Sequence, residues 1–184
     1  LFVAYWLAGD FAADENAPLA LAAAPTADVN SVARGGLLYD TWWKVVPGAT
    51  EPKDNQPLWA LQTTNKRKGS VSWRCKECHG WDYKGKDGAY ATGSRRTGFP
   101  GVWDAAQKKS VGELAAVLRG LPNSKHDFSS VLRPADITDL ANFLKHGLVD
   151  TMKYVDYKSK KPIGGDVERG NQRKKQPRKY RRKR

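Results

Sequence analysis

The two cysteines of this 184-residue chain and one of its three histidines fall within five consecutive positions, Cys75 to His79. The run reads Cys-x-x-Cys-His. Two thiols at this spacing can each add to a vinyl group of one haem, and the adjoining histidine can then bind the iron. The run therefore predicts one covalently held haem c, attached through Cys75 and Cys78, with His79 as the proximal ligand.

A Cys-x-x-Cys pair also occurs in redox dithiols and in zinc sites. A zinc site would need two more ligands, and beyond His79 the chain offers only His126 and His146 as imidazoles. A zinc-bound histidine directly beside a ligating cysteine is also unusual in a four-ligand structural site. Haem is thus the favoured interpretation, with a dithiol or a zinc site as the alternatives.

The rest of the chain predicts helices and long loops. Ser110 and Glu113 have the spacing of a capping box, and apolar residues follow at helical intervals as far as Gly120. A further helix is expected to begin at Pro134 and to end at Gly147. No convincing alternating strand pattern occurs, so the sequence predicts an all-α fold.

Two segments resemble the first and last helices of class I cytochromes c. In the first, Gly35 precedes Tyr39 by four positions, and in the second, residues 139–145 include Phe143 on the face that would meet the first helix. A glycine where two helices cross lets their backbones approach closely. The resemblance covers residues 32–157 and implies a cytochrome c fold in which the N- and C-terminal helices cross.

The resemblance also implies a second axial ligand in the loop before the last helix, where the family usually has methionine. In this chain the loop reads Lys125-His126-Asp127-Phe128. His126 is therefore the expected distal ligand, since neutral imidazole binds haem iron. Met152 is the alternative, although it follows the last helix, and His146 is a third candidate. Histidine on both sides predicts a lower reduction potential than histidine with methionine.

Aromatic and glycine-rich stretches flank the attachment run. Trp73 and Trp81 are predicted to line the haem pocket. The glycines of residues 80–88 would let that loop wrap closely around a flat cofactor. A backbone carbonyl within residues 99–103 is expected to accept the N–H of His79 and so orient its ring.

Three parts are predicted along the chain: the end of a membrane anchor with a tether at 1–31, a cytochrome c domain at 32–157, and a basic tail at 158–184. Residues 1–9 are apolar, but they are too few to cross a bilayer, which takes about 20 residues. Acids follow them, with no Lys or Arg before Arg34, which places the domain on the periplasmic side of a bacterial membrane. The prolines of residues 45–69 predict an inserted loop relative to a minimal class I cytochrome.

The positive charge is concentrated at the C-terminal end. The formal net charge is +13, and residues 158–184 hold 13 Lys or Arg against two acids. Such a segment suits an acidic protein surface or anionic lipid. Nucleic acid is a less favoured partner, because no base-stacking aromatic pattern accompanies the charges. Residues 165–170 also resemble the opening of a second cytochrome c domain.

No paired acids, activated nucleophile or phosphate-binding loop stands out beside the haem motif. The sequence therefore predicts an electron-transfer protein without catalysis of its own, acting with redox partners as a carrier or as a subunit of a membrane respiratory or photosynthetic complex. One alternative is a haem enzyme subunit whose labile distal ligand lets it act on a small molecule. Another is a zinc-site protein with a nucleic-acid-binding tail.

Overall fold

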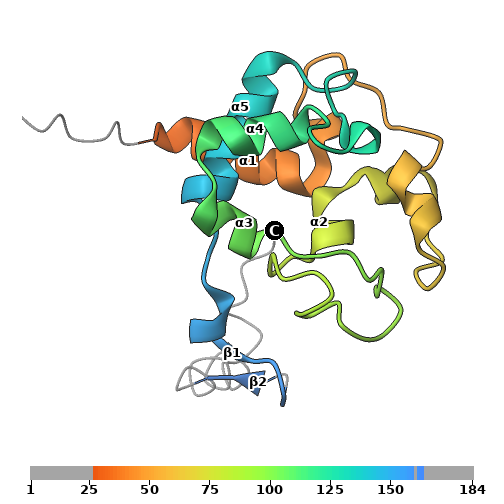
Figure 1. Cartoon of the computed structure of the whole chain (residues 1–184), viewed down its shortest axis with the longest axis vertical. Coiled ribbons are helices and arrows are strands. Elements are labelled where there is room, and N and C mark those ends of the chain that lie inside the picture. The colour runs from red at the N-terminus through yellow and green to blue at the C-terminus, as the bar shows by residue number, and fades with distance from the viewer. Residues whose placement is uncertain (1–26, 160, 164–184) are drawn as a thin grey trace, which may run out of the picture.

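The computed structural model describes residues 27–159 and 161–163, and helices dominate it (Figure 1). Its α-helices are α1 (Val29–Thr41), α2 (Cys75–His79), α3 (Trp103–Lys108), α4 (Val111–Leu118) and α5 (Pro134–His146). The 3-10 helices are η1 (Trp42–Lys44), η2 (Pro57–Leu61), η3 (Gly69–Trp73), η4 (Ser124–His126) and η5 (Thr151–Lys153). The all-α class is confirmed for the described residues, with one addition. The strands β1 (Val155–Asp156) and β2 (Lys161–Pro162) form an antiparallel pair too short to show an alternating pattern.

The helices α1 and α5 cross at a glycine (Figure 1). A Cβ atom on Gly35 would overlap the backbone oxygen of Asp139 and the Cβ of Phe143. Only glycine therefore allows the two backbones to come this close. One turn further along α1, Tyr39 packs against Phe143 with ring centres 5.6 Å apart. This crossing forms the centre of the core, where Leu38 is fully buried.

A buried carboxylate also joins these two helices. Asp136, in the first turn of α5, has no exposed surface and forms ion pairs with Arg133 and with Arg34 of α1. Arg34 reaches Asp139 as well, at 2.5 Å. Hydrogen bonds from Arg133 and then from Arg34 hold the pKa of the Asp136 carboxyl well below its usual range. Asp136 is therefore ionised whenever the domain is folded near neutral pH.

The core continues from α1 toward the loop that precedes α5. Trp42 and Trp43 pack edge to face with ring centres 5.5 Å apart, and Trp42 meets Trp73 at 6.3 Å. Trp73 in turn packs on Phe128 at 5.9 Å. These T-shaped contacts have the arrangement that aromatic rings prefer. They connect α1 to both sides of the site described below.

The predicted start of α4 and both predicted ends of α5 are confirmed, whereas α4 ends at Leu118, two residues before Gly120. Ser110 caps α4, with its backbone N–H donating to the Glu113 carboxylate at 2.7 Å and its hydroxyl accepting from the Glu113 N–H at 3.3 Å. α5 has Pro134 as its first residue and Gly147 as its C-cap. α4 packs against α5, and the chain that connects the two helices contains η4.

The predicted tether, anchor and basic tail lie at or beyond the ends of the described residues. α1 begins at Val29, so residues 29–31 belong to this helix and not to the tether predicted at 1–31. The predicted anchor, nearly all of the basic tail at 158–184, and the segment that resembles a second domain lie outside the described residues. None of the helices in the described part combines the length and apolar character needed to cross a bilayer.

Replacing Gly35 with alanine is expected to lower the free energy of unfolding by about 1–3 kcal/mol, because the added Cβ forces α1 away from α5. Gly112→Ala in α4 is the matched control, since a Cβ there would approach only the Ser110 hydroxyl, at 4.0 Å. That change should stabilise the domain by up to about 1 kcal/mol, because alanine favours a helix. Chemical denaturation of both variants measures the difference. Equal effects would show that close helix approach is not what requires glycine at position 35.

Asp136→Asn is expected to flatten the acid side of the stability profile. Because the folded pKa of Asp136 is lowered, its stabilising effect is fully present above the unfolded value of about 3.9 and is lost as pH falls below it. The free energy of unfolding of the wild type should therefore fall more steeply than that of the variant between about pH 5 and pH 2. Asp104→Asn, at an exposed position of α3, is the control. Denaturation at a series of pH values tests this, and parallel profiles for wild type and Asp136→Asn would contradict it.

Candidate functional site

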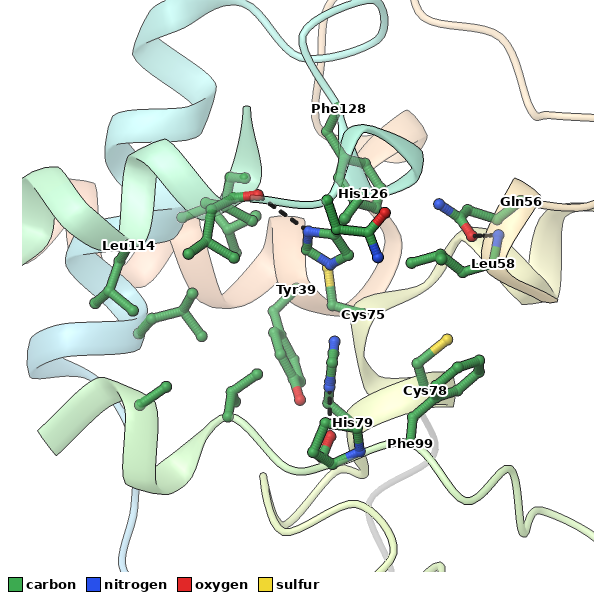
Figure 2. A pocket seen from close by; sticks show the side chains of 18 of the residues that line it. Tyr39, Gln56, Leu58, Cys75, Cys78, His79, Phe99, Leu114, His126 and Phe128 are labelled. Atoms are coloured by element: carbon green, nitrogen blue, oxygen red, sulfur yellow. Dashed lines mark hydrogen bonds between the residues drawn. The ribbon is translucent and has the colours of Figure 1, made fainter. Parts of the chain in front are cut away.

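A cavity of about 430 Å³ opens between α2, the loop at 99–102 and α3 on one side and α4 with η4 on the other. Figure 2 shows the side chains that line it. Its walls are mostly apolar, with leucine, valine and aromatic side chains contributed by α1, η2, α4, α5 and the loops. Cys75, Cys78, His79 and His126 all lie on its surface.

The helix α2 brings both thiols to the cavity. α2 ends at His79, and its C-cap Gly80, with a φ of 82°, turns the chain sharply. The Gly80 carbonyl accepts a hydrogen bond of 2.8 Å from the buried Tyr39 hydroxyl. This bond fixes α2 against α1. Cys75 and Cys78 are free thiols, and burial raises the pKa of each to about 12. Both side chains are therefore protonated at neutral pH.

His79 is oriented by a backbone carbonyl. Its Nδ1 lies 2.7 Å from the oxygen of Pro100, which is within the segment where such an acceptor was expected. A carbonyl oxygen can only accept, so Nδ1 carries the hydrogen and Nε2 keeps its lone pair in the neutral ring. Burial lowers the pKa of His79 to about 4, although the Pro100 bond opposes this. The ring is thus neutral at pH 7, with Nε2 free to bind a metal.

His126 is held in the same way from the opposite wall. It ends η4, and its Nδ1 lies 3.1 Å from the carbonyl oxygen of Val117 in α4. A carbonyl oxygen can only accept, so Nδ1 carries a hydrogen here too, and Nε2 is the nitrogen that would bind a metal. In Figure 2 the ring nitrogens of His79 and His126 that carry no dashed line face each other across the cavity. The ring centres are 6.1 Å apart and the ring planes are inclined by 73°.

This spacing has a direct chemical meaning. Two imidazoles that bind one metal ion from opposite sides, each at about 2 Å, have ring centres roughly 6 Å apart. The two rings can therefore hold a single ion between them with little movement. Within the described residues, no cluster of three or more His, Cys, Asp or Glu side chains is arranged to hold a metal ion.

Of the other residues predicted for the site, some line the cavity and some do not. Trp73 lines the cavity, whereas Trp81 does not and is 47% exposed, which corrects its assignment to the pocket. Trp81 follows Gly80, where the chain turns away from α2 and toward solvent. Met152 is 57% exposed in η5, and His146 is exposed at the end of α5. Neither lines the cavity, so of the three distal candidates only His126 faces His79.

Sequence reasoning missed a buried carboxylate inside the attachment run itself. Glu77 has no exposed surface, and its two oxygens accept hydrogen bonds from Asn65 at 2.9 Å and from Arg95 at 2.7 Å. Arg67 lies 3.7 Å away. These partners come from two separate loops, so Glu77 fastens both loops to α2. The one signal in the sequence was an acid between the two cysteines, and its partners follow no local spacing.

Glu77→Ala is expected to lower the free energy of unfolding by about 1–3 kcal/mol, because it leaves the buried amide of Asn65 without its acceptor and removes the partner of the exposed Arg95 guanidinium. Glu51→Ala is the matched control, since Glu51 is exposed and bonds only the Ser70 hydroxyl. It should change the free energy by no more than about 0.5 kcal/mol. Urea denaturation gives both values. A similarly small effect of the two substitutions would show that Glu77 does not hold the two loops against α2.

Comparison of the chain with protein-family models, with curated proteins and with solved structures finds no match. The chemistry of the site is therefore inferred from its own geometry. Two thiols on one helix lie beside two imidazoles that face each other across a largely apolar cavity.

Proposed function

We propose that this domain binds one haem c between His79 and His126, attached covalently through Cys75 and Cys78, and that it transfers electrons. The observation that carries the proposal is the facing pair of imidazoles, 6.1 Å apart, on a cavity that both motif cysteines also line. The motif alone predicts three of these residues. The fourth, His126, arrives at the opposite wall from a loop some fifty residues further along the chain.

The size and the apolar lining of the cavity support a porphyrin as its ligand. Pockets for cofactors typically measure about 300–1,000 Å³ and are lined mainly by apolar side chains, and this one measures about 430 Å³. Two leucines that line it, Leu61 and Leu121, are 67% and 63% exposed. Exposed apolar side chains at the rim of a cavity are typical of a ligand site. A flat apolar ligand would cover part of this surface and stabilise the domain through its burial.

The architecture around the cavity supports a class I cytochrome c fold. In proteins of that family, which residues 33–39 and 139–145 resemble, the first and last helices cross at a glycine and the attachment run lies next to them. In this domain α1 crosses α5 at Gly35, and the Tyr39 hydroxyl binds the end of α2. The proposed distal residue also lies where the resemblance places it, in the loop before α5.

The protein side chains would contribute position and electrostatics. When bound, haem supplies an iron that exchanges single electrons between its ferrous and ferric states. The carbonyls of Pro100 and Val117 fix the orientation of the two ligating rings, so that little rearrangement is needed when the charge changes. The apolar walls limit access of water, which is one of the means by which proteins set a reduction potential.

A haem iron held by both His79 and His126 would exchange electrons and would leave no place for a substrate. We therefore propose a carrier or a subunit of a redox complex and not an enzyme in its own right. The apolar start of the chain followed by acids supports a location on the periplasmic side of a bacterial membrane. The basic residues of 158–184 would suit an acidic partner surface or anionic lipid.

If His126 is the distal ligand, the His126→Ala variant should lose the low-spin spectrum of the wild type. The holoprotein should change from a low-spin spectrum to one with an open iron position, and its reduced form should bind carbon monoxide readily. His146→Ala and Met152→Ala are the controls, because both side chains are exposed and neither lines the cavity. Both controls should keep the wild-type spectrum. Absorption spectra of the oxidised and reduced proteins make the comparison.

Two results would overturn these assignments. A near-infrared sulfur-to-iron band in the oxidised wild type would show that Met152 and not His126 is the distal ligand. An intact mass of natively matured protein without the mass of one haem would remove the cofactor itself. A redox titration of the same material should give a potential below that of cytochromes with histidine and methionine ligands.

A further inference from the structure

The segment between α1 and α2 reaches across the cavity to the distal side. Gln56 precedes η2, is 5% exposed and lines the cavity. Its side-chain N–H donates to the carbonyl oxygen of Lys125 at 2.7 Å, and its side-chain oxygen accepts from the N–H of Leu58 at 2.6 Å. Figure 2 shows Gln56 and Leu58 on the side of the cavity beside His126. A buried amide with both of its polar ends engaged has a defined position.

The bond to Lys125 acts on the peptide unit that carries His126. The carbonyl of this unit accepts from Gln56, and its N–H, which belongs to His126, donates to the Asn123 carbonyl at 2.8 Å. Both polar groups of the peptide next to the His126 Cα are therefore held. Within the described residues, the other hydrogen bonds of η4 and its flanking residues run inside this loop or to α4. Gln56 thus makes the hydrogen bond that reaches the distal loop from outside that half of the domain, beside the packing of Trp73 on Phe128.

The other end of the segment is anchored beside the attachment run. The backbone N–H of Gln56 donates to the Ser72 hydroxyl at 2.9 Å, and this hydroxyl donates to the Gly69 carbonyl at 2.6 Å. Ser72 is 1% exposed, and Trp73 after it donates from its indole to the Asp54 carbonyl at 2.9 Å. We call residues 54–73 the strap. It connects the residues just before Cys75 to the loop that bears His126.

We propose that Gln56 is a positioning residue for the distal ligand: through the Lys125 carbonyl it holds the His126 loop against the cavity and slows the departure of His126 from the metal. This inference rests on the proposed function for its metal and on the hydrogen bonds above for its geometry. The strap lies within the insertion predicted at residues 45–69 and its continuation, so the device belongs to this chain and not to a minimal class I cytochrome. It sets how readily an external ligand can replace His126.

The test compares Gln56→Leu with Gln62→Leu in the full-length holoprotein. Gln62 is half-buried in the same strap, and its amide makes two hydrogen bonds, both to the backbone of Asn65 inside the strap. The two variants therefore lose equally many side-chain bonds, and only the first loses contact with the distal loop. Carbon monoxide binding to the reduced protein requires His126 to leave. Gln56→Leu should accelerate it by about tenfold, the equivalent of one net hydrogen bond, and Gln62→Leu should leave it within about twofold of wild type.

Hydrogen exchange supplies a second readout that needs no haem. Amides of residues 121–128 should exchange faster in Gln56→Leu than in Gln62→Leu, because only the first variant frees the Lys125 carbonyl. Gln56→Asn, whose shorter amide keeps the site polar, should act in the same direction and covers the case in which the leucine variant does not fold. Unchanged carbon monoxide kinetics together with unchanged exchange in both Gln56 variants would overturn the inference. Protein that matures without haem would instead overturn the proposed function, and the exchange comparison would still decide the role of Gln56.

Discussion

The structure depends on one close approach, that of α1 to α5 at Gly35. The crossing sets the direction of α1, from which Tyr39 reaches the end of α2 and holds the attachment helix in place. It equally sets α5, against which α4 packs, and α4 supplies the Val117 carbonyl that orients His126. The positions of both walls of the cavity therefore depend on the same helix pair, α1 and α5. A displacement at this crossing would change the separation of the two imidazoles, which is the quantity that matters for a shared ligand.

Of the three carboxylates without exposed surface in the described part of the chain, Glu77, Asp82 and Asp136, two lie where separate segments meet. Asp136 lies where α1 meets α5, and Glu77 lies where two long loops meet α2. Each of these two carboxylates is fully buried and has more than one basic or amide partner, at least one of which comes from another segment. Removal of one partner from such a group leaves an uncompensated polar atom, so these joints specify one arrangement of the loops more strongly than apolar contacts could. The cavity itself is left largely free of charge.

The sequence was informative where the determinants are local. The capping box at Ser110, the proline start and glycine end of α5, and the attachment run are read from neighbouring residues, and the structure places helices at each. Trp81 was assigned to the pocket because it is next to the run, but the positive φ of Gly80 turns it outward. The contacts of Glu77 and Gln56 could not be predicted, because their partners lie in loops whose paths are set by tertiary packing and follow no periodic pattern.

The crossing at Gly35 joins two helices that are synthesised at different times. Arg34 and its partner Asp139 are 105 residues apart in the chain, although they form an ion pair in the folded domain. At a translation rate of about 5–20 residues per second, α1 leaves the ribosome roughly 5–20 s before the helix that covers it. During that interval the apolar face around Leu38 has no native partner. The two helices can therefore dock on each other only after the last helix of the domain has been made.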